Sequence, residues 1–314
     1  MTGTKVVAIG SFADTDATAL AGDLHALRVH RFAEIERLDA AARAAITCIA
    51  FKGHEPFGPD QMALMPNLGL IANFGVGYDT IDVAAASLSG IRVTNTPDVL
   101  NDDVADLALA LWLMQGREML QASDWARSGE WAAKGEYPLN RKVSGGKVGI
   151  VGLGRIGREI ADRLAAFKCE IHYHSRTEKP TAGWTYHGDV VSLAGAVDFL
   201  FVALVGGPET VGYVSREAIA ALGPRGVIVN ISRGTTIDEA AMLDALETGA
   251  IAGAGLDVFL NEPGIDPRFY ALPNVVIQPH QGSGTVETRA AMGQLQRDNI
   301  SAFLAGRSLL TPVN

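Results

Sequence analysis

The stretch KVGIVGLGRIGREIADRL, residues 147–164, decides the fold of this chain. Its first five residues form a short apolar run typical of a buried parallel strand, and its last ten have the composition of a helix. Between the two stand Gly152, Gly154 and Gly157, in the pattern G-x-G-x-x-G. A glycine-rich turn that follows a strand and opens a helix is the fingerprint of a dinucleotide-binding unit.

Each of the three glycines has a separate physical role. Gly152 permits the tight turn, Gly154 lets the backbone approach a pyrophosphate, and Gly157 lets the helix pack closely on the sheet. Peptide N–H groups and the helix dipole then bind the anion. The residues of this loop that we expect to bind the cofactor are Gly152, Gly154, Arg155, Ile156 and Gly157.

The end of the next strand decides which dinucleotide binds. Sites for NAD carry Asp or Glu about 20 residues after the first glycine, where the carboxylate binds the ribose 2′-OH. In this chain the strand within residues 169–180, CEIHYHSRTEKP, has no carboxylate at its end. Arg176, flanked by the hydroxyl donors Ser175 and Thr177, suits a 2′-phosphate instead. The sequence therefore predicts NADPH as the preferred cofactor, with NADH as the alternative.

Short apolar strands alternate with helices over the rest of the chain. Before residue 98 we expect four strands, within residues 5–10, 44–51, 68–75 and 90–97. A long helix is expected over Val99–Leu120 and a last one over Thr285–Leu304. In the second half we expect six strands, within residues 147–154, 169–176, 198–205, 226–232, 254–259 and 274–280. This alternation predicts an α/β protein with doubly wound parallel sheets.

Composition excludes several other classes of protein. The chain has 314 residues, enough for two domains, and a net charge of −9 without a long Lys/Arg cluster, so neither nucleic acid nor a membrane surface is an expected partner. The longest apolar run, Leu107–Met114, is too short to cross a bilayer, and no signal peptide is expected. Cys48 and Cys169 form no disulfide framework, and the seven histidines lack metal-ligand spacing. We expect a cytoplasmic protein without a metal.

Three charged residues follow three predicted strands of the second half. Arg233 comes after residues 226–232, Glu262 comes after residues 254–259, and His280 ends the last strand. The carboxyl ends of parallel strands lie at one edge of a sheet, where ligands bind in open α/β folds. Such a set could supply a proton donor, a partner for that donor and a guanidinium that binds a carboxylate.

Six stretches together resemble the D-isomer-specific 2-hydroxyacid dehydrogenases, over essentially the whole length of the chain. They are NFGVGYDTIDV, VTNTPDVLNDDVADLALAL, GGKVGIVGLGRIGREIADRL, VIVNISRGTTIDEAAMLDAL, AGLDVFLNEP and QPHQGSGT. Within that family the chain is most similar to NADPH-dependent glyoxylate/hydroxypyruvate reductases. It also resembles hydroxyphenylpyruvate reductases, through HYHSRTEKP and the segment after His280.

The resemblance implies a role for each matching residue. It makes His280 the general acid of the reduction, Glu262 the partner of that histidine, and Arg233 the residue that binds the carboxylate of a 2-oxoacid. It places the backbone N–H groups of Val76 and Gly77 around the same carboxylate.

Further roles near the cofactor also come from the resemblance. It places Asp257 near the nicotinamide carboxamide and puts Ile231 and Gly282 on segments that flank the cofactor. It also implies that Trp131 helps to close the active site, either of its own subunit or of a neighbouring one.

The resemblance also implies two Rossmann-like domains with a cleft between them. Residues 1–98 and 285–314 would form a discontinuous substrate-binding domain, and residues 99–284 the dinucleotide-binding domain. A homodimer, formed through the cofactor domain, is the expected assembly.

Two positions depart from the family pattern. Gln281 stands where an apolar residue is common, and the segment VALVGGPET changes the expected cofactor contacts at Leu204–Pro208. The expected function is NADPH-dependent reduction of small 2-oxoacids to D-2-hydroxyacids, with glyoxylate and hydroxypyruvate favoured. The alternatives are a hydroxyphenylpyruvate reductase and a cofactor-sensing, corepressor-like interaction protein. The identity of the substrate depends on the fit of its side chain at residues 51–56 and Phe74.

Overall fold

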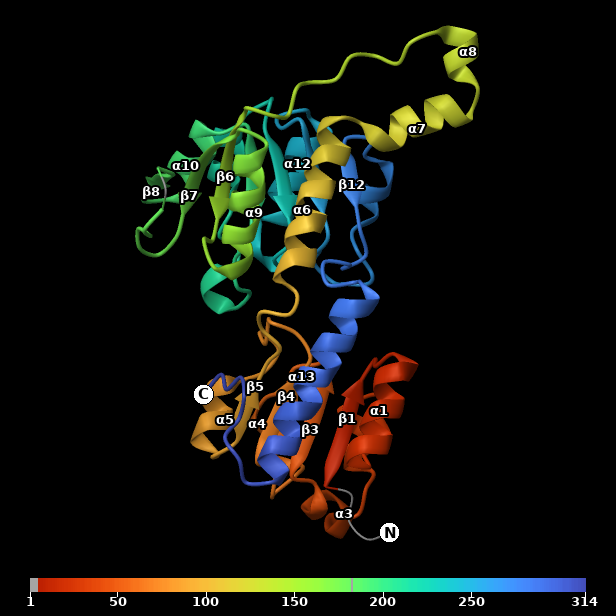
Figure 1. Ribbon diagram of the computed structural model, residues 1–314, viewed down its shortest axis with the longest axis vertical. Coiled ribbons are helices and arrows are strands. Elements are labelled where there is room, and N and C mark those ends of the chain that lie inside the picture. Colours follow the sequence, from red (N-terminus) through yellow and green to blue (C-terminus); the bar gives the residue numbers. More distant parts are fainter. Residues whose placement is uncertain (1–4, 182) are drawn as a thin grey trace. The chain divides into compact units, whose positions relative to one another are not determined.

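The computed structural model describes residues 5–181 and 183–314 (Figure 1). The chain divides into two compact units. Unit 1 contains Met1–Leu100 and Thr285–Asn314, and unit 2 contains Asn101–Gly284. Each unit is an α/β structure built on one parallel sheet, as the sequence predicts.

The sheet of unit 1 has the order β2-β1-β3-β4-β5, and its strand pairs are all parallel among the described residues. Its strands are β1 Val6–Gly10, β2 Leu27–Val29, β3 Cys48–Lys52, β4 Leu70–Asn73 and β5 Arg92–Thr94. This is the order of a doubly wound sheet, in which the order of strand addition reverses between β1 and β3. The short edge strand β2 was not predicted. The helix Asp14–Leu24 before it ends where His25 adopts a left-handed conformation with φ 51°, and β2 begins at Leu27.

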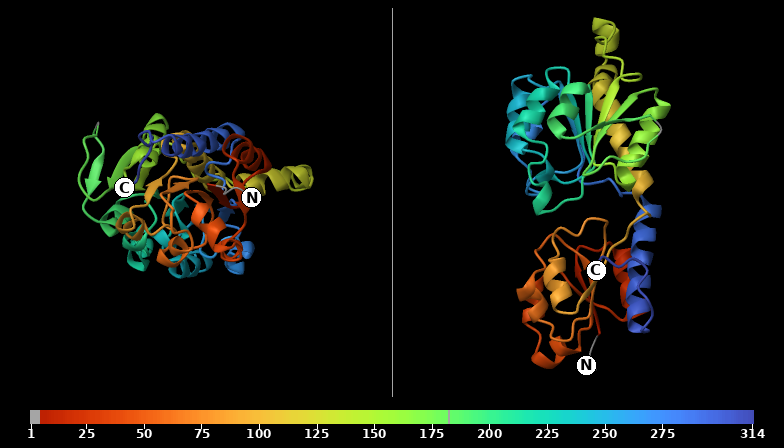
Figure 2. Two further views of the ribbon diagram at one scale, coloured as in Figure 1. Left: turned by 90° about the horizontal axis from the view of Figure 1, so that it is seen from below. Right: turned by 90° about the vertical axis from the view of Figure 1, so that its left-hand side faces the viewer.

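Helices cover both faces of this sheet. They are α1 Asp14–Leu24, α2 Phe32–Glu36, α3 Ala40–Ala45, α4 Pro59–Ala63, α5 Val83–Leu88 and α13 Val286–Leu304. The C-terminal helix α13 lies beside α1 and along β3 and β4 (Figures 1 and 2). The buried Gln296 of α13 donates hydrogen bonds to Ala72 O at 2.7 Å and to Phe51 O at 3.3 Å. These bonds attach the end of the chain to the first sheet.

The sheet of unit 2 has seven parallel strands among the described residues, in the order β12-β11-β10-β9-β6-β7-β8. They are β6 Lys147–Val151, β7 Glu170–His174, β8 Thr185–His187, β9 Phe199–Val202, β10 Val227–Asn230, β11 Gly253–Leu256 and β12 Val275–Ile277. This is the strand order of the dinucleotide-binding fold with one further strand, and its switch point lies between β6 and β9. Strand β8 was not predicted.

The helices of unit 2 also lie on both faces of their sheet. They are α6 Asn101–Gly116, α7 Met119–Arg127, α8 Glu130–Lys134, α9 Arg155–Ala166, α10 Val190–Ala196, α11 Arg216–Leu222 and α12 Glu239–Glu247, with short 3-10 helices at Pro208–Thr210, Gly234–Thr236 and Pro267–Ala271. Helices α6 and α9 pack together, and α10, α11 and α12 form a second layer. The single helix expected over Val99–Leu120 is shorter, because Glu118 has a left-handed conformation with φ 44° and starts α7 in a new direction.

Aromatic packing holds α6 on the sheet of unit 2. Trp112 is fully buried, and its ring centroid lies 5.3 Å from that of Phe167, 5.6 Å from that of Phe199 and 6.2 Å from that of Phe201. Edge-to-face contacts at these distances are favourable in addition to the area that they bury. These contacts pack α6 against β9 and against the C-terminal end of α9, the helix that the glycine loop opens.

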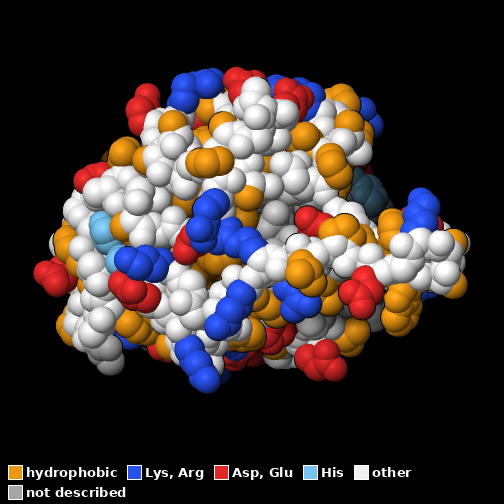
Figure 3. All heavy atoms as spheres, turned by 90° about the horizontal axis from the view of Figure 1, so that it is seen from above, with side chains coloured by type: hydrophobic (Ala, Val, Ile, Leu, Met, Phe, Trp, Pro, Cys, Tyr) orange, Lys and Arg blue, Asp and Glu red, His pale blue; other side chains and the backbone are white. Residues whose placement is uncertain are grey.

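Helices α7 and α8 project from unit 2 as an arm (Figure 1). Hydrophobic side chains are exposed on this arm, as Figure 3 shows, and they include Met119, Leu120 and Trp131. Leu139, in the segment that follows α8, is exposed as well. Within residues 5–181 and 183–314, no helix combines the length and apolar character that a membrane span requires.

Candidate active site

The glycine loop has the geometry that its sequence predicts. Gly152 has φ 98°, and its N–H donates to His174 O at 2.9 Å. A Cβ at Gly152 would lie 2.7 Å from Ala203 O, and a Cβ at Gly157 would lie 2.0 Å from Gly152 O, so a side chain at either position would collide with backbone. The turn and the closely packed helix both require glycine here.

Gly154 differs from the other two glycines. A Cβ at this position would meet nothing within 4 Å, so the backbone borders open space. Gly154 is also the N-cap of the twelve-residue helix α9, and no side chain caps it. The first-turn N–H groups of α9, which include those of Arg155 and Ile156, therefore suit a diphosphate at the positive end of the helix dipole.

The end of β7 lies beside this loop, because β6 and β7 pair in parallel with Val151 opposite His174. Arg176 and Thr177 follow as exposed residues. The hydroxyl of Ser175 donates to Thr177 O at 2.6 Å, so this donor is used within the loop. Arg176 remains the cation at this edge that matches a 2′-phosphate.

The atypical segment 202–210 lies at the same edge. It follows β9, the neighbour of β6, and its Leu204 O accepts a hydrogen bond from the Ser232 hydroxyl at 2.6 Å. Thr210 Oγ1 donates to Val205 O at 2.8 Å, which closes the turn. Hydrogen bonds with the protein thus organise this segment despite its unusual sequence.

His280 and Glu262 form a direct pair. His280 Nδ1 lies 2.7 Å from Glu262 Oε2, and Glu262 Oε1 accepts a hydrogen bond from Phe259 N at 2.8 Å. The carboxylate is thus held by backbone on one side and contacts the imidazole on the other. A carboxylate at Nδ1 fixes the orientation of the ring and leaves Nε2 as the nitrogen that can face a substrate.

Asp257 fixes the backbone that follows this histidine. Asp257 is buried, and its two carboxylate oxygens accept hydrogen bonds from Gln281 N at 2.6 Å and Gly282 N at 2.7 Å. Burial raises the pKa of Asp257, while the two backbone donors oppose that rise. In this structure Asp257 therefore positions the loop of His280 and Gly282.

Arg233 lies next to the segment of Glu262. It follows β10, whose Asn230 pairs with Leu256 of β11, and its backbone oxygen accepts from the Thr236 hydroxyl at 2.6 Å. A Cβ at Gly234 would lie 2.3 Å from Leu260 N, which shows how closely the two loops approach. Arg233, Glu262 and His280 thus follow the adjacent strands β10, β11 and β12, with the buried Ile231 on the first of these segments.

Val76 and Gly77 lie in unit 1, on the loop that follows β4. Asparagine side chains bind three successive carbonyls of this loop: Asn73 Nδ2 donates to Gly75 O at 3.2 Å and to Gly77 O at 2.9 Å, and Asn95 Nδ2 donates to Val76 O at 3.0 Å. Gly75 has φ 146°, a conformation that favours glycine. The conformation of the expected carboxylate-binding loop is thereby fixed.

Two cations beside this loop were not identified from the sequence. Lys52 Nζ lies 4.3 Å from the ring centroid of Phe74, and the Arg289 guanidinium carbon lies 5.8 Å from it. Burial and the positive charge of Arg289 lower the Lys52 pKa. Both cations are brought together by tertiary contacts with the Phe74 ring, and the local sequence pattern does not predict such contacts.

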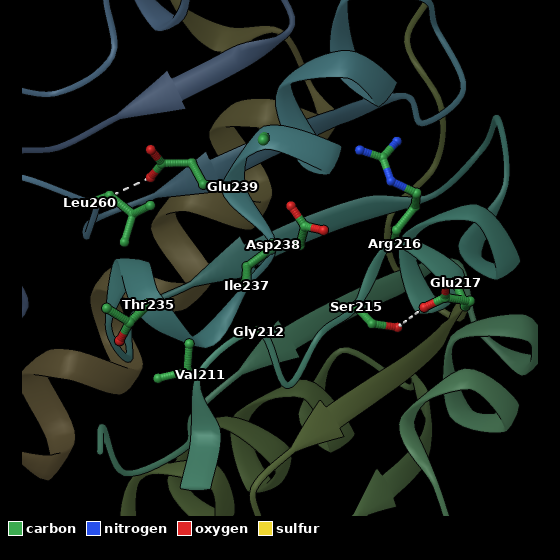
Figure 4. Close-up of a pocket in the computed structure, with 11 residues that line it drawn as sticks. Val211, Gly212, Ser215, Arg216, Glu217, Thr235, Ile237, Asp238, Glu239 and Leu260 are labelled. Carbon is green, nitrogen blue, oxygen red and sulfur yellow. Dashed lines mark hydrogen bonds between the residues drawn. The ribbon is translucent and has the colours of Figure 1, made fainter. Parts of the chain in front are cut away.

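A surface hollow of about 530 Å³ lies between the starts of α11 and α12 (Figure 4). Its lining contains none of Arg233, Glu262 and His280, so it is separate from the candidate active site. Glu239 borders it; its carboxylate accepts a hydrogen bond from Leu260 N at 2.8 Å, and burial raises its pKa. Glu239, which the sequence reasoning missed, thus positions the loop that leads to Glu262.

A parallel sheet with a glycine loop at its switch point, and an acid–base pair at the same carboxyl edge, defines a dinucleotide-dependent oxidoreductase. Residues 109–282 match the family model described as D-isomer specific 2-hydroxyacid dehydrogenase, NAD binding domain. The chain belongs to the D-isomer specific 2-hydroxyacid dehydrogenase family, which confirms the family and fold predicted from the sequence.

Known proteins match this chain over nearly its whole length. It is 46% identical to a hydroxyphenylpyruvate reductase of Plectranthus scutellarioides over 277 residues, which cover 88% of each protein. An NADPH-dependent glyoxylate/hydroxypyruvate reductase of Sinorhizobium meliloti, solved with NADP and malonate, is 41% identical with a TM-score of 0.92 and covers 99% of this chain and 97% of its own. A 2-hydroxyacid dehydrogenase of Ketogulonicigenium vulgare is 47% identical with a TM-score of 0.90, and the match covers 100% and 99% of the two chains.

Proposed function

We propose that this protein is an NADPH-dependent reductase that converts small 2-oxoacids to D-2-hydroxyacids, with glyoxylate and hydroxypyruvate as favoured substrates. The observation that carries the proposal is the pairing of His280 Nδ1 with Glu262 Oε2 at 2.7 Å, beside the loop of Arg233. The Sinorhizobium meliloti relative, named as an NADPH-dependent glyoxylate/hydroxypyruvate reductase, supports the same substrates and cofactor.

In this proposal the side chains divide the work of the reduction. Bound NADPH supplies a hydride to the carbonyl carbon of the substrate. His280 gives a proton to the developing alkoxide, and Glu262 balances the charge of the protonated ring. Arg233 binds the carboxylate, as do the N–H groups of Val76 and Gly77. Charge stabilisation by a guanidinium is strongest where water is excluded.

The cofactor preference is part of the proposal and rests on Arg176. No carboxylate stands at the end of β7, where one would repel a 2′-phosphate, and the exposed Arg176 lies one residue beyond Ser175 at that edge. We further propose that Gly152, Gly154, Arg155, Ile156 and Gly157 bind the diphosphate, with Ser175, Thr177, Ile231, Asp257, His280 and Gly282 near the cofactor.

Oxidation of NADPH, followed at 340 nm with a panel of 2-oxoacids, tests the function. We expect glyoxylate and hydroxypyruvate to give the highest kcat/KM, with 4-hydroxyphenylpyruvate as the contrasting aromatic substrate. A preference for the aromatic acid would favour the activity named for the Plectranthus relative. No oxidation with any acid would contradict the proposal and favour an interaction protein.

Substitution of Arg176 tests the cofactor preference separately. Arg176→Asp should weaken NADPH binding far more than NADH binding, because a carboxylate repels the 2′-phosphate. Lys142→Asp, the same change of charge at an exposed site outside this loop, is the control. Equal losses for both cofactors in the Arg176 variant would contradict its assignment.

We also propose a division of labour between the units and an assembly. Unit 1 binds the substrate and unit 2 the dinucleotide, in a homodimer that uses the exposed hydrophobic side chains of the α7–α8 arm. Trp131, 64% exposed in this chain, is the arm residue that we expect a second copy to cover. Light scattering of Trp131→Ser should show a weaker dimer. The free thiols Cys48 and Cys169 support a reducing, cytoplasmic setting.

A further inference from the structure

Residues 175–181, which follow β7, include Arg176, and two tyrosines contact this segment: the fully buried Tyr173 and the half-buried Tyr186. We propose that Tyr173 and Tyr186 are positioning residues that present Arg176 to the 2′-phosphate of the cofactor. This inference rests on the proposed NADPH preference. Among residues 175–181, no backbone-to-backbone hydrogen bond closes the loop, so side chains must determine its conformation.

Tyr173 provides the main attachment. It is fully buried in β7, and its hydroxyl donates to Lys179 O at 2.9 Å while accepting from Lys179 N at 2.9 Å. One phenol therefore satisfies both backbone groups of a single loop residue. Because a buried phenol finds a definite partner, this contact fixes where the loop turns back over the sheet.

Tyr186 provides the second attachment, at the other side of Arg176. Its hydroxyl donates to Ser175 O at 3.3 Å, and its ring centroid lies 5.5 Å from that of Tyr173. Ser175 and Lys179 are therefore both tied to the paired tyrosines, and Arg176 lies between these two fixed points. The backbone of the expected phosphate-binding residue is held before any ligand binds.

The helix of the glycine loop supports the same loop. Arg158 of α9 donates from Nη2 to Pro180 O at 3.0 Å, and its guanidinium carbon lies 5.3 Å from the ring centroid of Trp184. The residues that would contact the 2′-phosphate and the diphosphate are thus connected through one helix. A loop ordered in advance loses less conformational freedom on binding, and this improves affinity for the ligand that it fits.

The nucleotides 2′,5′-ADP and 5′-AMP are suitable probes, because they differ only in the 2′-phosphate. Calorimetry should show that wild-type protein binds 2′,5′-ADP more tightly than 5′-AMP. Tyr173→Phe removes both hydrogen bonds to Lys179, and this preference should fall at least about five- to tenfold, the effect of one typical hydrogen bond. Affinity for 5′-AMP should stay within about twofold, since the diphosphate loop is untouched.

Tyr213→Phe is the matched control. Its hydroxyl lies 2.9 Å from His174 Nε2 at the same sheet edge, so the change removes a contact with β7 and leaves the tyrosine bonds to Ser175 and Lys179 in place. The control should keep the wild-type preference. Hydrogen exchange gives a second measurement: the Lys179 amide should exchange faster in Tyr173→Phe, and Tyr186→Phe should show a smaller loss of preference because its bond is longer.

The outcomes separate the two proposals. If wild-type protein binds both nucleotides equally, the NADPH preference is wrong and the inference fails with it. If the wild type discriminates and Tyr173→Phe and Tyr186→Phe keep the same ratio, the preference stands and the positioning role is overturned. If Tyr173→Phe does not fold, two measurements on Tyr186→Phe decide whether the tyrosines position the loop: the ratio of 2′,5′-ADP to 5′-AMP affinity and the exchange rate of the Lys179 amide.

Discussion

Replacement of Glu262 by Gln tests the acid–base pair directly. The amide oxygen can still accept from Phe259 N, but the amide group would then present an N–H to His280 Nδ1 in place of a carboxylate oxygen. The protonated ring would lose a charge-assisted hydrogen bond. Neutral His280 can accept from the amide, so the variant disfavours the form that donates the proton.

The structure sets the size of the expected loss. Hydrogen bonds to charged groups contribute about 1.5–3 kcal/mol. The two side chains are 38% and 22% exposed, so solvent screening favours the lower end, about 1.5–2 kcal/mol. At about 1.4 kcal/mol for each factor of ten, the single-turnover rate should fall about 10- to 30-fold.

Single-turnover oxidation of NADPH with hydroxypyruvate measures this loss, and fluorescence titration gives the Kd of NADPH. The Kd should be unchanged. Glu239→Gln is the control, because its carboxylate binds Leu260 N in the same loop, whereas the carboxylate that contacts His280 Nδ1 is that of Glu262. A rate above half that of the wild type in Glu262→Gln, or equal losses in both variants, would refute the reasoning.

Three further outcomes concern stability and reactivity. Burial and the neighbouring His172 lower the pKa of His187. The neutral imidazole therefore stabilises the native state fully above about pH 6.5, and this contribution is lost as the pH falls through the lowered pKa. Tm should fall more steeply with decreasing pH in the wild type than in His187→Gln. Burial raises the pKa of Cys48 to about 11, so iodoacetamide at pH 8 should label Cys169 first in native protein, as peptide mass spectrometry can establish. Trp112→Ala should lower the free energy of unfolding of unit 2 by about 3–5 kcal/mol in urea titration, and a loss below about 1 kcal/mol would contradict its place in the core.

Predictions of the fold were accurate where a strand is buried on both faces. The unpredicted strands β2 and β8 have three residues each, and both lie at sheet edges with mostly exposed or half-exposed side chains. These two edge strands lack the apolar run that revealed the edge strands β5 and β12, so the hydrophobic pattern gives no signal for them. The helix expected through Leu120 ended early for a different reason, a left-handed residue at Glu118.

Predictions of the candidate site depended on the same physics. Arg233, Glu262 and His280 were expected at one edge because the carboxyl ends of parallel strands lie together, and the structure places them after three adjacent strands. Tyr173 and Glu239 were not expected. Each acts through hydrogen bonds to loop backbone, Tyr173 to the loop that directly follows its strand and Glu239 to a loop 21 residues along the chain. The alternation of polar and apolar residues does not indicate such bonds.

The sequence by itself determined the alternation of strands and helices, the glycine turn and the cation beyond β7, because all of these follow from local spacing and residue type. Only the tertiary structure decided the 2.7 Å contact of His280 with Glu262, and the tyrosines that hold the loop of Arg176. These contacts join residues that are not neighbours along the chain and that meet only when the surrounding elements pack together. Their geometry exists only once the sheet of unit 2 has formed and buried the apolar faces of its helices.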